Sequence, residues 1–252
     1  MSSKILAILE QRDGIIKRAG FEAASAASKL AIDLKLSADA LVIGDSISNL
    51  DEISKYGIQK IHYLKHAALT NYSSSAYSEA ISDLVKESDY DTIILANTTL
   101  GKDLAPRLCI KLDAACLVDC IKINVTGDEL VFTRPSYAGK ALLDIKLLSK
   151  KKVVTIRPNV FKAEIVNANA KSEVIVKELT EVNLRSRVTS FKKSEGKLDV
   201  AEADIIVSGG RGIKGPENFH LIEELAEAFG GAVGASRAVV DAGWRPHSEQ
   251  VG

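Results

Sequence analysis

The stretch Ala203-Asp-Ile-Ile-Val-Ser-Gly-Gly-Arg-Gly212 decides how the C-terminal part of the chain folds. Its apolar run at 205–207 predicts a short buried strand, and residues 208–212 predict a turn rich in backbone N–H groups. Residues 216–229 predict a helix, because Pro and Glu open the run, apolar residues recur at helical spacing and a Gly-Gly pair follows. Residues 232–235 predict a second strand, so the stretch begins a β-α-β unit.

Each of these two strands is followed by an arginine. Arg211 lies in the first turn, and Ser236-Arg237 follows the second strand. Ligands of parallel sheets bind outside the carboxyl ends of the strands, so we expect both turns to open on one edge. Glycines let the backbone approach an anion, and an arginine fork pairs with phosphate. The pattern favours a phosphate-bearing ligand, although glycine-rich turns without a ligand are also common in α/β proteins.

The glycines do not follow a standard dinucleotide-binding motif. Gly210, Gly212 and Gly215 satisfy G-x-G-x-x-G, but Pro216 places the third glycine before the helix rather than in its first turn. The second strand ends in Ser-Arg, where an acidic residue would hold a ribose. The G-K-[ST] of a Walker A loop is absent as well.

Four segments resemble the electron transfer flavoprotein alpha subunit family, in the family's order and spacing. Together with the N-terminal Lys4-Ile-Leu-Ala-Ile-Leu-Glu10, they spread the resemblance over essentially the whole chain. The first of the four along the chain carries Lys140 where the family usually has Asn. In chain order, the four segments are R-P-S-Y-A-G-K-A at 134–141, V-S-G-G-R-G-I-K at 207–214, V-G-A-S-R-A-V-V-D-A-G-W at 233–244 and Q-V-G at 250–252.

The resemblance implies an FAD-mediated electron carrier rather than an enzyme with its own substrate turnover. By motif position, Arg211 would contact the phosphate side of FAD, Ser236 and Arg237 the flavin ring, and a further loop would line the cofactor. That loop is Gln250, Val251 and Gly252. No catalytic or metal-binding residues are expected. The resemblance also implies a beta subunit that binds AMP, flavin dehydrogenases such as acyl-CoA dehydrogenases as donors, and a membrane quinone oxidoreductase as acceptor.

Several alternatives stay open at this point. The chain could come from a bifurcating or nitrogen-fixation-type relative, from a non-redox nucleotide-binding module, or from a fragment that only assembles with the beta subunit. Arg237 could simply form a surface ion pair with Asp241, four residues further along a helix. In the family the chain continues beyond Q-V-G, so we expect an incomplete FAD domain that ends without a closing strand after Trp244.

The preceding residues predict a separate domain. Residues 1–194 alternate strands and helices, which predicts a doubly wound, mostly parallel sheet, and residues 195–252 would begin a second, Rossmann- or flavodoxin-like FAD-binding domain. The strands expected within 117–158 could be antiparallel additions to the parallel sheet. Residues 161–195 are polar apart from 174–176 and predict a hinge.

Composition limits the classes of partner. Lys plus Arg and Asp plus Glu number 33 each, so the formal net charge is zero, whereas nucleic-acid-binding and membrane-surface domains carry a basic excess. No apolar run is long enough to span a bilayer, and residues 1–4 lead into a strand without a targeting peptide. We therefore expect a cytoplasmic protein with no nucleic-acid partner and no membrane insertion.

Three further features have structural interpretations. The three cysteines, at 109, 116 and 120, fit no zinc spacing and predict buried thiols. The four histidines form no ligand pattern. The segment Asn97-Thr-Thr-Leu-Gly-Lys-Asp103 lies between a strand and a helix, where its Asn and Thr predict a helix cap. A nucleotide site there would need more cationic side chains than Lys102.

Overall fold

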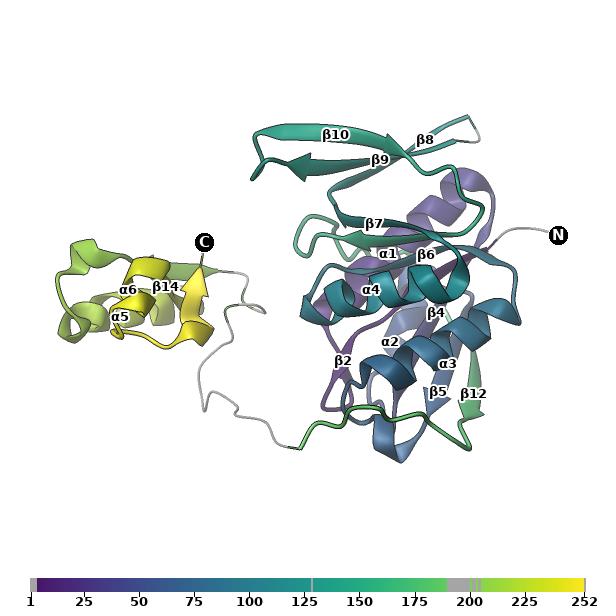
Figure 1. The fold of residues 1–252 in the computed structure, drawn as a ribbon, viewed down its shortest axis with the longest axis horizontal. Coiled ribbons are helices and arrows are strands. Elements are labelled where there is room, and N and C mark those ends of the chain that lie inside the picture. The colour runs from purple at the N-terminus through teal and green to yellow at the C-terminus, as the bar shows by residue number, and fades with distance from the viewer. Residues whose placement is uncertain (1–3, 128, 190–199, 201–202, 204, 252) are drawn as a thin grey trace. The chain divides into compact units, whose positions relative to one another are not determined.

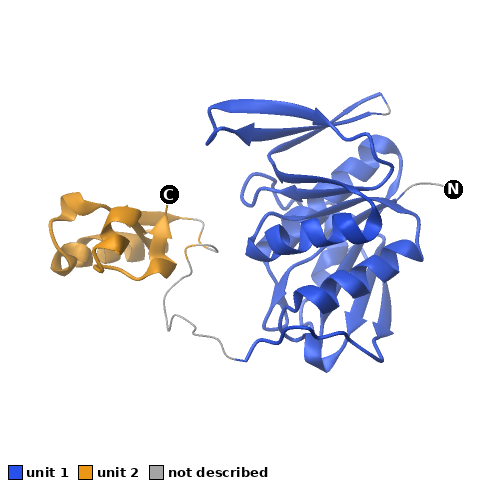
Figure 2. Cartoon of the chain, in the orientation of Figure 1, with its two compact units in different colours: residues 1–189 blue, residues 190–252 orange. Residues whose placement is uncertain are grey.

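The computed structural model describes residues 4–127, 129–189, 200, 203 and 205–251. The chain divides into two compact units, an N-terminal unit of residues 1–189 and a C-terminal unit of residues 190–252 (Figure 2). The domain boundary predicted near Ser194 lies outside the described residues.

A parallel sheet of seven strands forms the centre of the N-terminal unit (Figure 1). The doubly wound fold is confirmed, because all of its strand pairs are parallel and helices cover both of its faces. The strands, in sheet order, are β12 (Glu173–Glu178), β5 (Lys60–Lys65), β4 (Ser37–Gly44), β1 (Lys4–Ile8), β6 (Tyr90–Ala96), β11 (Lys152–Ile156) and β7 (Ala115–Cys120). The helical segments are α1 (Arg18–Leu34), α2 (Leu50–Ile53), η1 (Ser54–Tyr56), η2 (Ala67–Leu69), α3 (Ser74–Lys86) and α4 (Thr99–Leu112). A short ribbon of β2 (Gln11–Arg12) and β3 (Ile15–Ile16) follows β1.

Two hydrophobic cores lie on opposite faces of this sheet. Neighbouring residues of β1 alternate between them: Ile5 and Ala7 pack with α1, whereas Leu6 and Ile8 pack with α3 and α4. Because successive side chains of a strand point to opposite faces, a strand covered on both sides must be apolar throughout. This explains why the sequence of β1 reads as a continuous apolar run.

The expected antiparallel strands do not join the parallel sheet. Strands β8 (Lys122–Thr126), β9 (Glu129–Ser136) and β10 (Ala141–Lys146) form a separate three-stranded antiparallel sheet, while β7 and β11 belong to the parallel one. The reason lies at Asp119, which has φ 64° and coincides with a register shift between β7 and β11. Cys120 still pairs with Ile156, and the chain leaves the parallel sheet directly after it. The three strands that follow pair with one another.

Most of the segment expected to be a hinge packs as part of the N-terminal unit. Residues 174–176 lie in β12, which pairs with β5 at the edge of the sheet. Further along, Ser75 Oγ donates to the carbonyl of Asn183 at 2.8 Å, and Ser73 Oγ donates to that of Ser186 at 3.1 Å. The hinge prediction is therefore wrong for residues 173–186, whose backbone is tied to β5 and to the start of α3. Residues 190–195 lie outside the described part.

The C-terminal unit contains the β-α-β arrangement that the sequence predicts. Its parallel sheet has the order β13-β14-β15, and the third strand corrects the expectation that no strand follows Trp244. The segments are β13 (Ile206–Gly209), η3 (Arg211–Ile213), η4 (Pro216–Phe219), α5 (His220–Ala228), β14 (Ala232–Ser236), α6 (Arg237–Asp241), η5 (His247–Glu249) and β15 (Gln250–Val251).

The first strand of this unit is not buried, contrary to the sequence prediction. Ile205 is 43% exposed and Ile206 40% exposed. The unit's core is built around the buried residues Phe219, Ala235 and Val239. In the register, Gly209 pairs with Ala235, and Ile206 lies an odd number of residues before Gly209, so its side chain points to the opposite face. Because β13 is an edge strand, the side chain of Ile206 on this face stays partly in solvent.

Candidate functional site

The structure gathers the sequence-predicted site residues at the carboxyl ends of the three strands in the C-terminal sheet. Strands β13 and β14 run parallel with Gly209 opposite Ala235, so the turn holding Arg211 lies beside Ser236 and Arg237. Strand β15 brings Gln250 opposite Ala235 and Val251 opposite Ser236. Gly252 lies outside the described residues.

The glycines of this edge divide into two kinds. A methyl group at Gly209 would come within 2.8 Å of the Phe219 ring, so packing inside the unit requires glycine there. A methyl group at Gly210 would meet nothing closer than Ser236 Oγ at 3.9 Å, and one at Gly212 would meet no atom within 4 Å. Neither Gly210 nor Gly212 has a positive φ. Nothing within the described chain therefore requires glycine at these two positions.

The two arginines of the edge are exposed. The Arg237 side chain is 79% exposed, and its Nε lies 3.5 Å from an Asp241 carboxylate oxygen, so the ion pair considered from the sequence does form. An ion pair this open to solvent is worth little, about 0–1 kcal/mol. Because the pair is weak, it leaves the guanidinium available to an anion that can offer better hydrogen bonds.

Arg245 positions the last strand, and the sequence reasoning missed it. Its guanidinium binds both carboxylate oxygens of Glu249 at 2.6 and 2.8 Å, donates to Glu223 at 2.9 Å and lies 5.2 Å from the ring centre of Phe219. These contacts fix the segment that leads into β15 against α5. The i,i+4 spacing of Arg245 and Glu249 was the available signal, but the partner on α5 depends on the tertiary fold.

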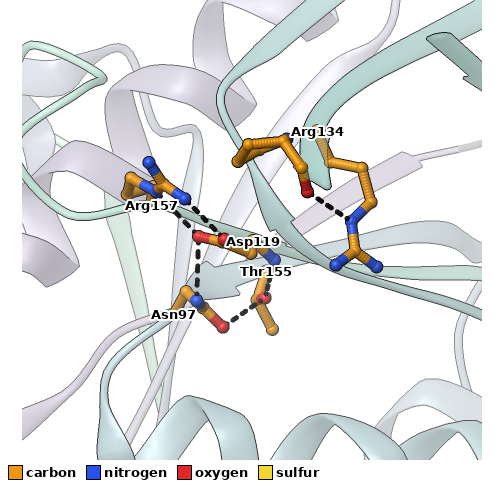
Figure 3. A network of polar contacts seen from close by, with 6 residues as sticks. Asn97, Asp119, Arg134, Thr155 and Arg157 are labelled. Atoms are coloured by element: carbon orange, nitrogen blue, oxygen red, sulfur yellow. Dashed lines mark hydrogen bonds and ion pairs between the residues drawn. The ribbon is translucent and has the colours of Figure 1, made fainter. Parts of the chain in front are cut away.

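A polar network closes the corresponding edge of the N-terminal sheet (Figure 3). The guanidinium of Arg157 donates to both carboxylate oxygens of Asp119, at 2.9 and 2.6 Å, and thereby lowers the pKa of Asp119 below its usual range. Asn97 donates to Asp119 at 3.1 Å and accepts from Thr155 at 2.8 Å. The positive charge of Arg134, in the R-P-S-Y-A-G-K-A segment, lowers the same pKa further.

The polar residues at this carboxyl edge of the N-terminal sheet bind one another or cap a helix. Thr98 Oγ1 accepts a hydrogen bond from the N–H of Gly101 at 3.2 Å, which confirms the helix-cap interpretation. A cavity of about 630 Å³ lies beside the network and is lined in part by Lys102. Its carboxylate, guanidinium and amide groups at Asp119, Arg157 and Asn97 already satisfy one another. We therefore keep the carboxyl edge of the C-terminal sheet as the candidate cofactor site.

A second buried network lies near the amino ends of strands β4, β5 and β6 of the N-terminal sheet. Tyr90 donates its hydroxyl proton to Asp39 at 2.7 Å, so the His62 Nε2 that lies 2.8 Å from the same hydroxyl must be the donor to it. Asp39 is 2% exposed. Burial lowers the pKa of His62, and the charges of Lys60 and Lys4 act in the same direction while that of Asp39 opposes them.

This histidine predicts a loss of stability in mild acid. In the unfolded chain, His62 binds a proton below its ordinary pKa of about 6.5. In the folded unit its pKa is lower, so it stays neutral over the same pH range. The free energy of unfolding therefore falls as the pH drops from about 7 to the folded pKa, by at most about 1.4 kcal/mol per pH unit. His62→Gln keeps an N–H donor for Tyr90 and does not titrate. Urea unfolding between pH 7.5 and 5 should therefore show a steeper loss for the parent than for this variant. Identical slopes would contradict the assignment.

The cysteine prediction is only partly correct. Cys109 and Cys120 are buried, but Cys116 is exposed. Within the described ranges, no group of three or more His, Cys, Asp or Glu side chains is placed to hold a metal ion. Of the helices that the structure describes, none is both long and apolar enough to cross a bilayer.

Comparison with known proteins agrees with the geometry. Residues 5–182 match the electron transfer flavoprotein domain, and residues 199–252 match the electron transfer flavoprotein FAD-binding domain. The electron transfer flavoprotein subunit alpha of Thermoanaerobacterium thermosaccharolyticum is 36% identical over 249 residues, which cover 96% of this chain and 76% of the relative. That of Bacillus subtilis is 33% identical over 254 residues, with 100% and 78% covered. Protein FixB of Clostridium saccharobutylicum is 33% identical over 248 residues, with 96% and 74% covered. The chain therefore belongs to the electron transfer flavoprotein alpha subunit family.

Proposed function

We propose that this chain is the alpha subunit of a cytoplasmic, heterodimeric electron transfer flavoprotein. It holds FAD at the carboxyl edge of the C-terminal sheet, pairs with a beta subunit that binds AMP, and works as a carrier without substrate turnover of its own. Its electron donors are flavin dehydrogenases, and its acceptor is a membrane quinone oxidoreductase. The observation that carries the proposal is the open backbone at Gly210 and Gly212, on the same sheet edge as two exposed arginines.

The chain's own residues suit a flavin dinucleotide. Gly210 and Gly212 leave room for a pyrophosphate against the backbone, and the fork of Arg211 can pair with it. Arg237 and Ser236 follow the neighbouring strand, where a cation beside the flavin ring would favour its negatively charged reduced form. Gln250 and Val251 border the same edge on β15. The flavin supplies the redox chemistry when it is bound, and the protein orients it and sets its potential.

The antiparallel sheet of the N-terminal unit offers a surface for the beta subunit. On β10, Leu142 is 63% exposed and Leu143 43% exposed, and Leu148 just after the strand is 88% exposed. Leu142 and Leu143 follow one another in the strand and point to opposite faces, so large apolar side chains are exposed on both faces of this hairpin. Exposed apolar side chains of this kind are typical of protein interfaces. We assign this hairpin to the contact with the partner subunit.

The function is tested by reconstitution. The chain is co-purified with its beta subunit, supplied with FAD and mixed with a reduced acyl-CoA dehydrogenase. We expect a yellow complex whose flavin absorbance bleaches as the dehydrogenase is reoxidised. A folded heterodimer that stays colourless in excess FAD would rule out the carrier role. A yellow complex reduced directly by NADH with two flavins bound would favour the bifurcating type.

The glycine at 212 gives a sharp test of the cofactor site. Gly212→Ala adds a methyl group into open space, so the thermal unfolding of the C-terminal unit should stay unchanged. The same methyl group would occupy the space left for the pyrophosphate, and we expect FAD affinity to fall by about tenfold or more, which is about 1.4 kcal/mol. Fluorescence titration with FAD measures this in the heterodimer.

Gly209→Ala is the matched control for this variant. Its methyl group would meet the Phe219 ring at 2.8 Å, so it should lower stability and FAD binding together. Equal FAD affinity in Gly212→Ala and in the parent would contradict the placement of the cofactor, whatever the result for Gly209→Ala.

A further inference from the structure

Two cysteines meet where α4 turns into β7. The carbonyl of Cys109 accepts hydrogen bonds from the N–H groups of both Asp113 and Ala114, the latter at 2.9 Å, so the helix ends one turn after Cys109. Asp113 takes the left-handed conformation with φ 50°, and β7 begins at Ala115. The chain therefore reverses tightly, and β7 runs back alongside α4 (Figure 1).

The sheet register aims Cys116 at Cys109. Cys116 pairs with Val153 of β11, and paired residues of neighbouring parallel strands point to the same face. Val153 is fully buried in the core beneath α4, together with Cys109. The next residue of β7, Leu117, belongs to the core on the other face. The two thiols are therefore neighbours, and each shifts the pKa of the other.

The two thiols of the pair differ in exposure and acidity. Cys116 is exposed, whereas Cys109 is 6% exposed. The neighbouring Cys109 thiol lowers the pKa of Cys116 to about 7, and the proximity of Cys116, together with burial, raises the pKa of Cys109. Cys116 is thus an accessible thiolate near neutral pH, and Cys109 is a protonated thiol held beside it. The thiolate is the reactive form of cysteine.

We propose that Cys116 and Cys109 form a peroxide-reactive dithiol, in which Cys116 is the attacking thiol and Cys109 the resolving one. The Cys116 thiolate attacks the terminal oxygen of a hydroperoxide, the O–O bond breaks, and a sulfenic acid forms. The leaving group is hydroxide from hydrogen peroxide, or an alkoxide from an organic hydroperoxide. The Cys109 sulfur then attacks the sulfenic sulfur, the S–O bond breaks, and water leaves with the thiol proton. The protein is oxidised by two electrons and the hydroperoxide is reduced by two. The product is a disulfide that ties the end of α4 to the edge strand β7.

The test uses the purified chain and hydrogen peroxide at neutral pH. After peroxide exposure, remaining thiols are blocked with N-ethylmaleimide and the protein is mapped by mass spectrometry. We expect a linked Cys109–Cys116 peptide lighter by the two thiol hydrogens, loss of two of the three alkylatable thiols, and full recovery with dithiothreitol. A linked peptide involving Cys120, or oxidation of Cys116 to sulfinic acid without a disulfide, would overturn the proposal.

Variants separate the two roles. Cys109→Ser should leave Cys116 as a sulfenic acid that dimedone traps, and Cys116→Ser should abolish the fast reaction with peroxide. Cys120 is a matched control, because its thiol is buried, donates to the Lys122 carbonyl at 3.0 Å and has a pKa raised to about 11. Cys120→Ser should react like the parent. If native Cys116 reacts with peroxide no faster than Cys120, the assignment fails without reference to any variant.

Discussion

Replacing Phe219 with alanine should destabilise the C-terminal unit by about 3–5 kcal/mol, the usual cost of removing a buried aromatic side chain. Phe219 is 1% exposed and is the largest fully buried side chain in the described part of this unit. Its ring also lies beneath the Arg245 guanidinium at 5.2 Å, so the variant loses a cation–π contact as well. A unit of this size has little stability to spare, and we expect most of it to be unfolded at 37 °C.

The single tryptophan makes this measurement selective. Trp244 packs against the Phe219 core, and the six tyrosines all lie in the N-terminal unit. Urea titration followed by Trp244 fluorescence should show the loss, while the far-UV transition of the N-terminal unit stays in place. Phe229→Ala is the matched control, since that ring is 59% exposed. If both phenylalanine variants unfold at the same urea concentration, the core is wrongly identified.

Replacing Gly101 with alanine should destabilise the N-terminal unit by about 3 kcal/mol or more, at the upper end of the cost of overpacking. The added methyl carbon would lie 1.8 Å from the carbonyl oxygen of Ala96, a backbone atom that no side-chain rotation can move. Alanine is otherwise favoured over glycine within a helix by about 1 kcal/mol, so propensity alone predicts the opposite sign. The close approach of α4 to the end of β6 decides the outcome.

The measurement for Gly101→Ala uses the same two signals as that for Phe219→Ala, with the opposite expectation for each. Far-UV circular dichroism should show a lower urea midpoint for the N-terminal unit, and the Trp244 signal should not change. Lys102→Ala, one residue along the same helix and exposed, should stay within about 0.5 kcal/mol of the parent. A Gly101→Ala variant as stable as Lys102→Ala would mean that α4 does not pack against β6 in this way.

The sequence predicted the strands and helices where one kind of local signal dominated. Alternating apolar strands and small-residue helices gave the doubly wound N-terminal unit, and the Gly-Gly pair after residue 229 marked the end of α5. Thr98 was recognised as a helix cap because its hydroxyl acts on an N–H group three residues away. Such signals act within a few residues and need no knowledge of the rest of the fold.

Errors arose where a segment's environment depends on distant residues. The apolar run at 205–207 has the composition of a buried strand, but an edge position leaves Ile206 40% exposed. The mostly polar segment 161–195 suggested a hinge, yet its apolar stretch at 174–176 lies in β12, which pairs with β5, more than a hundred residues earlier. Cys116 was wrongly expected to be buried. Composition does not show that β7 is an edge strand of the sheet, and this position leaves Cys116 exposed.

For the candidate site, the sequence supplied the residues and their order along the chain. Arg211, Ser236, Arg237, Gln250 and Val251 stand out as motif positions, and parallel pairing follows from the β-α-β pattern. The sequence alone could not say which glycines serve packing and which leave open space, nor that Arg245 holds the last strand in place. Those facts depend on contacts between segments that are remote in sequence, which form only when the sheet and its helices close on one another.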